Sequence, residues 1–318
     1  MKKVLVIAIS VIFILFFILI ICFIPKQTNI SFTKTNNRDL VIMMKNDVCF
    51  DGNEIYTKTH SFNSEGKRKV SFRFLNAKAF AVHNKMSYYL DEDGVLTISD
   101  ANGKHFFNID NVKKFALYKN KLIVLVSHSF DEAVLSIYSQ NGEFEKNIGS
   151  GSIYDFCSCG NNKILYRDNG LETFFEYDLH TDDLIDYPIC VDKDMYYTFS
   201  KSKFICNEKY VVFYEGFWDS NCIVSYNISQ QKYAVLLYDK KTKYDIKAEL
   251  LDDTLYFSCE AVDMKYSQIE DNENCGIWKV DLKTGEKTKL SNEKIKEFLV
   301  VNDKMLGVLK GGELKFLE

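Results

Sequence analysis

The residue types that most often carry catalysis or bind metals are thinly scattered in this sequence. Five histidines are spread along the chain: His60, His83, His105, His128 and His180. No two of them have the four-residue spacing of a helical zinc motif. No G-x-S-x-G nucleophile elbow occurs either, because Gly149-Ser150-Gly151-Ser152 has the wrong spacing. The sequence therefore predicts no catalytic residue, metal or cofactor from linear motifs.

One acidic cluster has the oxygen ligands that a divalent cation prefers: Asp263, Glu270, Asp271 and Glu273. A solvated acidic loop is the simpler interpretation of these carboxylates. Asp91-Glu92-Asp93-Gly94 is also acidic, but it lacks a downstream Glu at the position that a calcium loop requires. We interpret that segment as a hairpin turn in which the glycine adopts a left-handed conformation.

The chain contains nine cysteines, of which Cys22 lies in the apolar N-terminal segment and eight lie beyond it. Eight cysteines allow too many pairings for the connectivity to be solved from sequence. One interpretation is that all eight are small buried core residues, which is common for cysteine. Cys157-Ser158-Cys159 lacks the spacing of redox and zinc motifs and is expected to belong to a strand.

The sequence predicts a disulfide for one specific pair of cysteines. If Phe257 faces Ile277 across a hairpin, Cys259 faces Cys275 two residues further toward the loop. A disulfide between them would close the loop Glu260–Asn274 and stabilise the fold by roughly 3 kcal/mol through loop-closure entropy.

We expect β-strands to position these residues. Aromatic residues make up 14% of the chain, β-branched residues are also abundant, and both types favour sheets. The clearest unit is Gly276–Ser291, G-I-W-K-V-D-L-K-T-G-E-K-T-K-L-S. Two strands, the second Glu286–Leu290, flank the turn Lys283-Thr284-Gly285, and Gly285 supplies the positive φ that a tight hairpin needs. An isolated hairpin of this kind cannot bury both faces and must stack on further copies.

Further copies of this unit recur, each marked by a short polar pair before an apolar strand. The pairs are at Asn46-Asp47, Asn84-Lys85, Asn120-Lys121, Asn161-Asn162, Asn207-Glu208, Asp252-Asp253 and Asn302-Asp303. The strands expected after six of them are Met86–Leu90, Leu122–Ser127, Ile164–Arg167, Tyr210–Tyr214, Leu255–Cys259 and Met305–Leu309. A period of roughly 40–50 residues is typical of four-stranded propeller blades.

We therefore predict an all-β fold, a β-propeller of seven four-stranded blades. Six or eight blades remain open, and an antiparallel sandwich is the other alternative. The last copy, Lys294–Glu318, has room for only three strands. Asn29–Lys34 is expected to supply the fourth and to close the ring, which would remove an exposed sheet edge.

The I-W-K-V-D-L-K-T-G-E-K-T-K-L-S unit resembles the blades of TolB-like and YWTD-like bacterial propellers. Blades of these families commonly end in an Asp-x-x-Thr-Gly turn between two strands. The resemblance covers this unit well and the remaining blades loosely. It implies a fold and a style of binding, but it does not imply an activity.

The N-terminal residues 1–25 are predicted to form a transmembrane signal-anchor, and residues 26–318 the propeller domain. Val4–Ile24 is uncharged throughout and long enough as a helix to cross the ~30 Å hydrocarbon core of a bilayer. Lys2 and Lys3 favour a cytoplasmic N-terminus and an extracytoplasmic propeller on a single-pass protein. A cleaved signal peptide and a lipoprotein modified at Cys22 are the alternatives.

The binding face is expected where loops between second and third strands meet the connections between blades. These segments carry large aromatic residues and carboxylates, which suit recognition of a protein or a sugar-like ligand. The candidate binding residues are His128, Phe130, Asp131, Tyr196, Tyr197, Phe217, Trp218, Asp219 and Tyr266. The alternative is that Phe217 and Trp218 pack between blades.

The sequence favours a membrane-tethered binding module for a protein, peptide or glycan, with the lipid bilayer contacted through Val4–Ile24. The net charge of −4 indicates no basic face for nucleic acid. The alternative from another class is a hydrolase or lyase that acts on surface glycans with carboxylates at the channel mouth. A third alternative is an accessory subunit whose anchor contacts another membrane protein, although the anchor has no G-x-x-x-G packing motif.

Overall fold

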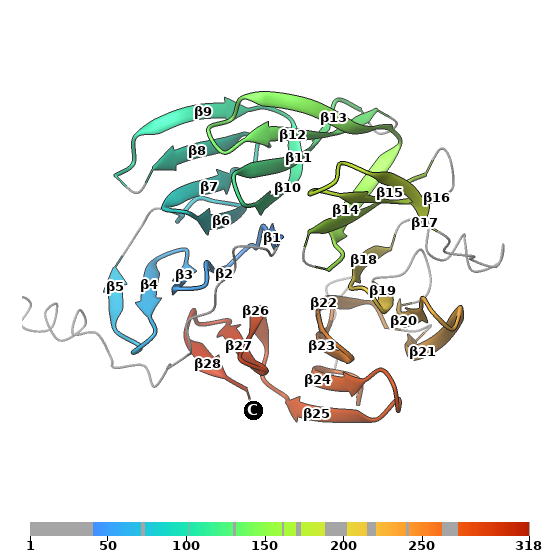
Figure 1. Ribbon diagram of the computed structural model, residues 1–318. Helices are drawn as coiled ribbons and strands as arrows, with labels where there is room; N and C mark the ends of the chain where they lie inside the picture. The colour runs from blue at the N-terminus through green and yellow to red at the C-terminus, as the bar shows by residue number, and fades with distance from the viewer. Residues whose placement is uncertain are drawn as a thin grey trace, which may run out of the picture.

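Seven antiparallel sheets are arranged in a ring in the computed structural model (Figure 1). The structure describes residues 41–70, 74–100, 102–129, 132–160, 162–169, 173–187, 202–214, 221–239, 242–262 and 273–317. Each sheet is one blade, and its strands pair in the order in which they occur in the sequence. The predicted seven-bladed β-propeller is therefore confirmed.

The first six blades have four sequential strands each. Blades 1 to 3 contain β2 (Val48–Phe50), β3 (Glu54–Thr57), β4 (His60–Asn63), β5 (Arg68–Val70), β6 (Ala79–His83), β7 (Met86–Leu90), β8 (Leu96–Asp100), β9 (His105–Ile109), β10 (Val112–Tyr118), β11 (Lys121–Ser127), β12 (Ala133–Ser139) and β13 (Phe144–Gly151). Blades 4 to 6 contain β14 (Ile153–Ser158), β15 (Lys163–Asp168), β16 (Thr173–Asp178), β17 (Leu184–Tyr187), β18 (Lys203–Cys206), β19 (Tyr210–Tyr214), β20 (Asn221–Asn227), β21 (Lys232–Asp239), β22 (Tyr244–Leu251), β23 (Thr254–Ala261), β24 (Gly276–Asp281) and β25 (Lys287–Ser291).

Blade 7 has three described strands, as its length predicts: β26 (Ile295–Val301), β27 (Lys304–Leu309) and β28 (Leu314–Phe316). The segment 29–34, which was expected to add the fourth, lies outside the described residues. A further strand, β1 (Ile42–Met43), pairs with the inner strand β10 and gives the sheet of blade 3 five strands. Figure 1 shows β1 near the middle of the ring.

The strands expected after the polar pairs are confirmed closely. Two of them coincide with β7 and β19, and the others differ at their ends by one or two residues. Asn84 and Lys85 both have positive φ, 49° and 64°, which a type I′ hairpin turn requires. The first copy is different, because Asn46-Asp47 precedes β2 instead of joining two strands. The first turn of blade 1 begins at Asp51, whose carboxylate accepts hydrogen bonds from two backbone N–H groups in that turn.

The core lies between neighbouring blades. In β11, Leu122 and Val124 pack toward blade 2, whereas Ile123 and Leu125 pack toward blade 4. Both faces of this strand are therefore buried, which explains its uninterrupted apolar sequence. The first and last blades meet in the same way, because Val48 of blade 1 lies in one cluster with residues of blade 7. Side-chain packing thus closes the ring.

No helix among the described residues has the length and apolarity needed to cross a bilayer. The predicted anchor, segment 4–24, lies outside the described residues.

Candidate functional site

The antiparallel strand order gives the ring two different faces. The turns between first and second strands and between third and fourth strands lie on one face, which we call the turn face. The loops between second and third strands and the connections between blades lie on the other, which we call the loop face. A site on either face would be assembled from several blades.

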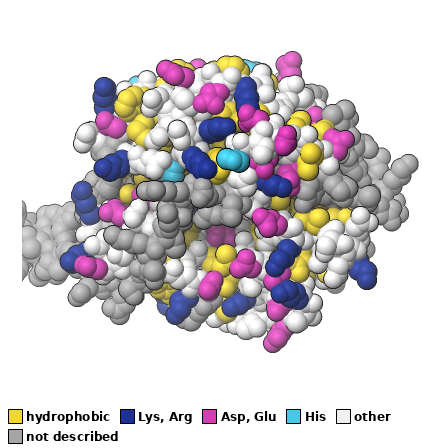
Figure 2. Space-filling view, in the orientation of Figure 1, with side chains coloured by type: hydrophobic (Ala, Val, Ile, Leu, Met, Phe, Trp, Pro, Cys, Tyr) yellow, Lys and Arg dark blue, Asp and Glu magenta, His cyan; other side chains and the backbone are white. Residues whose placement is uncertain are grey.

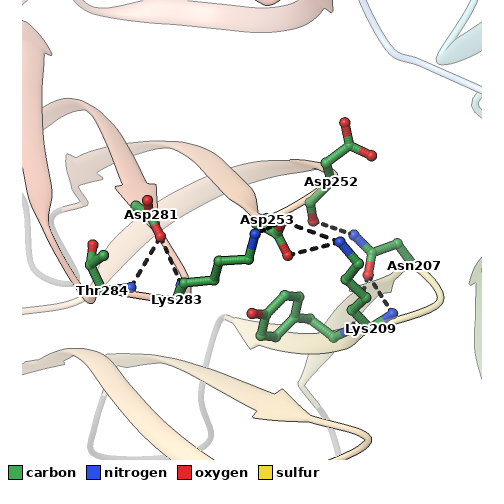
Figure 3. A network of polar contacts seen from close by, with 8 residues as sticks. Asn207, Lys209, Asp252, Asp253, Asp281, Lys283 and Thr284 are labelled. Atoms are coloured by element: carbon green, nitrogen blue, oxygen red, sulfur yellow. Dashed lines mark hydrogen bonds and ion pairs between the residues drawn. The ribbon is translucent and has the colours of Figure 1, made fainter.

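The polar groups of the turn face bind neighbouring blades to one another (Figure 3). The side-chain amide of Asn207 in blade 5 donates a hydrogen bond to the carbonyl oxygen of Asp252 in blade 6, at 2.6 Å. Lys283 and Lys209 form ion pairs with Asp253 at 2.6 and 3.1 Å. The hydrogen bond from Lys283, supported by Lys209, holds the pKa of Asp253 below its usual value. The polar residues of this network thus hold blades 5 and 6 together.

Similar links recur between other blades on this face. Asn84 donates from its side-chain amide to the carbonyl of Lys119, 3.3 Å away in blade 3. The hydroxyl of Tyr256 in blade 6 donates to the carbonyl of Asp303 in blade 7, at 3.1 Å. In two of the polar pairs, the asparagine side chains of Asn84 and Asn207 therefore link neighbouring blades.

On the loop face, a groove runs between blades 6 and 7 and reaches the start of blade 1. Its inner part is a cavity of about 190 Å³ that includes Cys259, Gly276 and Glu293 in its lining. Its outer part is an open hollow of about 530 Å³ whose lining includes Asp47 and Lys310. Both parts share Lys247, Glu260 and Ile295. We refer to the two together as the 6/7 groove.

Charges of both signs line the 6/7 groove in equal number. The lysines are Lys247, Lys294, Lys296 and Lys310, and the carboxylates are Asp47, Asp245, Glu260 and Glu293. Each of the four carboxylates pairs with a lysine: Asp245 with Lys247 at 2.5 Å, Glu260 with Lys310, Glu293 with Lys315 at 2.7 Å, and Asp47 with Lys58 at 3.8 Å. Figure 2 likewise shows positive and negative side chains interspersed over the visible face.

Glu293 lines the inner part of the groove, and its two carboxylate oxygens have different surroundings. Its Oε1 binds Lys315, whereas its buried Oε2 has no hydrogen-bond partner among the described residues. A buried carboxylate oxygen without a donor is costly to the folded state.

The wall of the groove corrects the register from which the Cys259–Cys275 disulfide was predicted. Ser258 lies opposite Ile277 and Cys259 lies opposite Gly276, so the register differs by one residue from the expected one. Cys275 lies just before β24, and both cysteines are buried. Burial raises the pKa of Cys259 to about 12.

Gly276 is required at this position in the wall. Its φ is +129°, and a Cβ there would lie 2.7 Å from the backbone oxygen of Ser291. The close approach of β24 and β25 at the groove therefore depends on the absence of a side chain.

A second charged cluster lies on the inner strands of the ring. The segment 41–47 is held to blade 3 by a hydrogen bond from Met44 N to Phe115 O, at 3.2 Å. Its Lys45 pairs with the carboxylate of Glu249 in β22. The other oxygen of Glu249 accepts a hydrogen bond from Val300 N at 2.7 Å. Lys45 therefore ties blade 6 to a segment that is anchored on blade 3.

Glu297 of β26 completes this cluster. Its side chain is buried, with the residue 7% exposed. Burial raises its pKa, and the nearby charge of Lys45 opposes that effect only in part. Burial lowers the pKa of Lys45, but the charges of Glu249 and Glu297 outweigh it and leave that pKa raised. Two carboxylates thus lie near Lys45 inside the ring, and the ion pair of this lysine is with Glu249.

Of the residues predicted to bind a ligand, His128 is described. It is exposed just after β11, and its backbone N donates to Glu132 O at 3.0 Å. The others lie outside the described residues: Phe130, Asp131, Tyr196, Tyr197, Phe217, Trp218, Asp219 and Tyr266. In the acidic cluster, Glu273 is exposed, and Asp263, Glu270 and Asp271 lie outside the described residues.

The strands that precede these segments are nonetheless informative. β11, β19 and β23 are second strands of their blades, so their C-terminal ends lie on the loop face, as does the 6/7 groove. The sequence does not single out Lys247, Glu260 and Lys296. Isolated charged residues are common near the ends of exposed strands, so they do not mark a site. The elaborate β23–β24 connection was the one signal that pointed to this part of the ring.

No protein-family model and no curated protein sequence matches the chain. Among solved structures, an acylaminoacyl peptidase from Pyrococcus horikoshii is similar with a TM-score of 0.52 and 13% identity, over 91% of this chain and 54% of that one. The β-propeller domain of the trilobed protease from Pyrococcus furiosus has a TM-score of 0.45 and 12% identity, over 74% and 82% of the two chains. TolB from Acinetobacter baumannii has a TM-score of 0.41 and 13% identity, over 72% and 64%. At these identities the similarity concerns the fold alone, and the chain spans about half the length of the peptidase.

Proposed function

We propose that this chain is a membrane-tethered propeller that binds a protein, peptide or glycan on its loop face and performs no chemistry itself. The observation that carries the proposal is the 6/7 groove, which opens as a hollow on the loop face of the ring. It lies on the face to which the aromatic segments 127–132 and 216–220 connect. Binding sites are commonly built from such variable loops on a fixed scaffold.

The charges of the groove support recognition of a polar ligand. Four lysine ammonium groups and four carboxylates line it. A polypeptide or a glycan carries donors and acceptors along its length and suits such a surface. Charged groups at an interface contribute mainly to the choice and orientation of the partner.

The tether is proposed from the sequence. The segment 4–24 is apolar throughout and long enough to span a bilayer as a helix, and Lys2 and Lys3 precede it. The propeller would then face the outside of the cell, where its loop face is accessible to a surface ligand.

Site-specific photo-crosslinking in the full-length protein tests the groove. A photoreactive residue replaces Lys296, which is exposed in the groove, in cells that produce the protein. The matched control replaces Lys232, which is exposed at the start of the outer strand β21. We expect one dominant crosslinked adduct from position 296 and none from position 232. Equal adducts from both positions, or none from either, would contradict the proposal.

A glycan hydrolase or lyase is the second candidate, and Glu297 favours it. A buried carboxyl with a raised pKa next to another carboxylate resembles the acid of a glycosidase pair. Lys45 lies near both glutamates and pairs with Glu249, and this lysine weakens the alternative because it already satisfies one of the two carboxylates. Cleavage of a glycan by the full-length protein that is lost in Glu297→Gln would establish the enzyme and remove the non-catalytic proposal.

A further inference from the structure

Three cysteines meet where the inner strands of blades 4 and 5 lie side by side. Cys157 is in β14, Cys159 follows the end of that strand, and Cys206 ends β18. Cys159 and Cys206 are direct partners in an isolated parallel β-bridge. All three residues are buried, with exposures of 3%, 1% and 7%.

The thiol of Cys206 is the centre of this cluster. Its Sγ lies 3.3 Å from the Sγ of Cys157 and 3.2 Å from the carbonyl oxygen of Ser158. The Sγ of Cys159 lies 3.4 Å from the carbonyl oxygen of Asn207. A disulfide has an S–S bond of about 2.05 Å and a Cβ–Cβ separation of about 3.5–4.5 Å. The two sulfur atoms therefore need to approach by only about 1.3 Å.

We propose that Cys157 and Cys206 form a disulfide that joins the inner strands of blades 4 and 5. One cysteine thiolate attacks a sulfur of an oxidised dithiol partner, a mixed disulfide forms and the first partner thiol leaves. The second cysteine then attacks the mixed disulfide, and the second partner thiol leaves. The protein loses two electrons and two protons, and the partner disulfide gains them. This inference goes beyond the proposed ligand binding and does not depend on the groove.

The surroundings of the thiols favour a disulfide over a metal site. The part of the chain that the structure describes contains no group of three His, Cys, Asp or Glu side chains placed to hold a metal ion. Burial, together with the neighbouring thiols, raises the pKa of Cys206. The thiolate is therefore scarce once the ring has formed, and the disulfide forms while blades 4 and 5 assemble. After assembly, burial protects it from reductants.

The position of the disulfide gives it a structural consequence. β17 ends at Tyr187 and β18 begins at Lys203, so a long connection separates the two blades in the chain. A covalent bond between their inner strands would hold the blades together independently of that connection.

Peptide mapping of the full-length protein tests the proposal. Cells are treated with an alkylating agent before lysis, so that air cannot oxidise the thiols afterwards. Trypsin places Cys157 and Cys159 in the peptide 147–163 and Cys206 in the peptide 204–209. We expect these two peptides as a linked pair that has lost two hydrogen atoms and that separates on reduction. Fragmentation should locate the link at Cys157.

Variants and metal analysis provide the controls. Cys206→Ser should abolish the linked pair, whereas Cys222→Ser should keep it, because Cys222 is buried in the same apolar cluster without a place in the disulfide. Reduction of the unfolded protein, followed by refolding with reductant present, should lower the Tm of the wild-type protein and of Cys222→Ser by about 5 °C or more. Alkylated peptides alone, a link at Cys159, or one equivalent of zinc or copper on reduced thiols would each overturn the proposal.

Discussion

Asn207 of blade 5 is hydrogen bonded to Asp252 of blade 6 through its side-chain amide, at 2.6 Å (Figure 3). The same side chain also shapes its own turn, because its Oδ1 accepts hydrogen bonds from Lys209 N and Tyr210 N, both at 2.9 Å. One residue therefore joins the local hairpin to the ring. This dual role gives a physical reason for the asparagine in this polar pair.

Two substitutions separate the two roles of Asn207. Asn207→Asp keeps the acceptor for its own turn but loses the donor to Asp252, and we expect it to destabilise the protein by about 1 kcal/mol. Asn207→Ala loses both functions and should cost about 2 kcal/mol. Thermal unfolding followed by circular dichroism would show the larger decrease in Tm for Asn207→Ala. Equal values for the two variants would mean that the bond between the blades contributes nothing.

A pair of glycines in blade 6 tests how closely its strands approach. Gly285→Ala places a Cβ at φ +77° with no atom within 4 Å, so only backbone strain of about 1 kcal/mol is expected. Gly276→Ala adds a collision with the backbone oxygen of Ser291, 2.7 Å away, and should cost about 3 kcal/mol. The Tm of each variant measures the difference. A Gly276→Ala protein as stable as Gly285→Ala would show that β24 and β25 can separate without cost.

The sequence predicts the blades well because each hairpin is determined locally. Gly285 does have the positive φ that its turn requires, at +77°. The continuous apolar sequence of β11 predicts burial on both sides of the strand, and its residues do face blade 2 and blade 4 in turn. The predicted register between β23 and β24 is wrong by one residue, because the long connection between the two strands leaves their pairing open. Only the contacts of the folded strands place Gly276 opposite Cys259.

The candidate site was less predictable, because its residues come together only when the ring closes. Asp47, Glu260 and Lys310 belong to blades 1, 6 and 7, yet they line one hollow. The pairing of Lys45 with Glu249 joins positions 204 residues apart in the sequence. No local pattern marks either arrangement.

The charge of Glu297 predicts how stability depends on pH. Burial raises its pKa above the ordinary value of 4.5, so the folded state holds the proton more tightly than the unfolded state. The contribution of protonated Glu297 to the free energy of unfolding is therefore complete below pH 4.5. It is lost as the pH rises through the higher pKa that Glu297 has in the folded protein. Glu297→Gln should remove this loss, so its advantage in Tm over the wild type should grow as the pH rises above 4.5. Parallel curves for the two proteins would contradict the burial of a titrating carboxyl group.

The thiols of blade 6 are expected to behave differently from those of blades 4 and 5. Because Cys259 lies opposite Gly276, we expect Cys259 and Cys275 to be alkylated separately after unfolding without reductant. In the folded protein at pH 8 alkylation of Cys259 should be slow, because its pKa of about 12 leaves little thiolate. Trypsin places the two residues in peptides 248–265 and 266–279, so a linked pair would be detected and would contradict this register.

Reversing one charge in the 6/7 groove should separate binding from stability. Lys296 is exposed, so Lys296→Glu should change the stability by less than about 0.5 kcal/mol. With a photoreactive residue at position 294 of the same groove, we expect the yield of crosslinked adduct to fall about tenfold, which corresponds to about 1.4 kcal/mol. Lys232→Glu, a reversal on the outer strand β21, should leave the yield unchanged. An adduct that persists at full yield in Lys296→Glu would mean that the charges of the groove do not select the ligand.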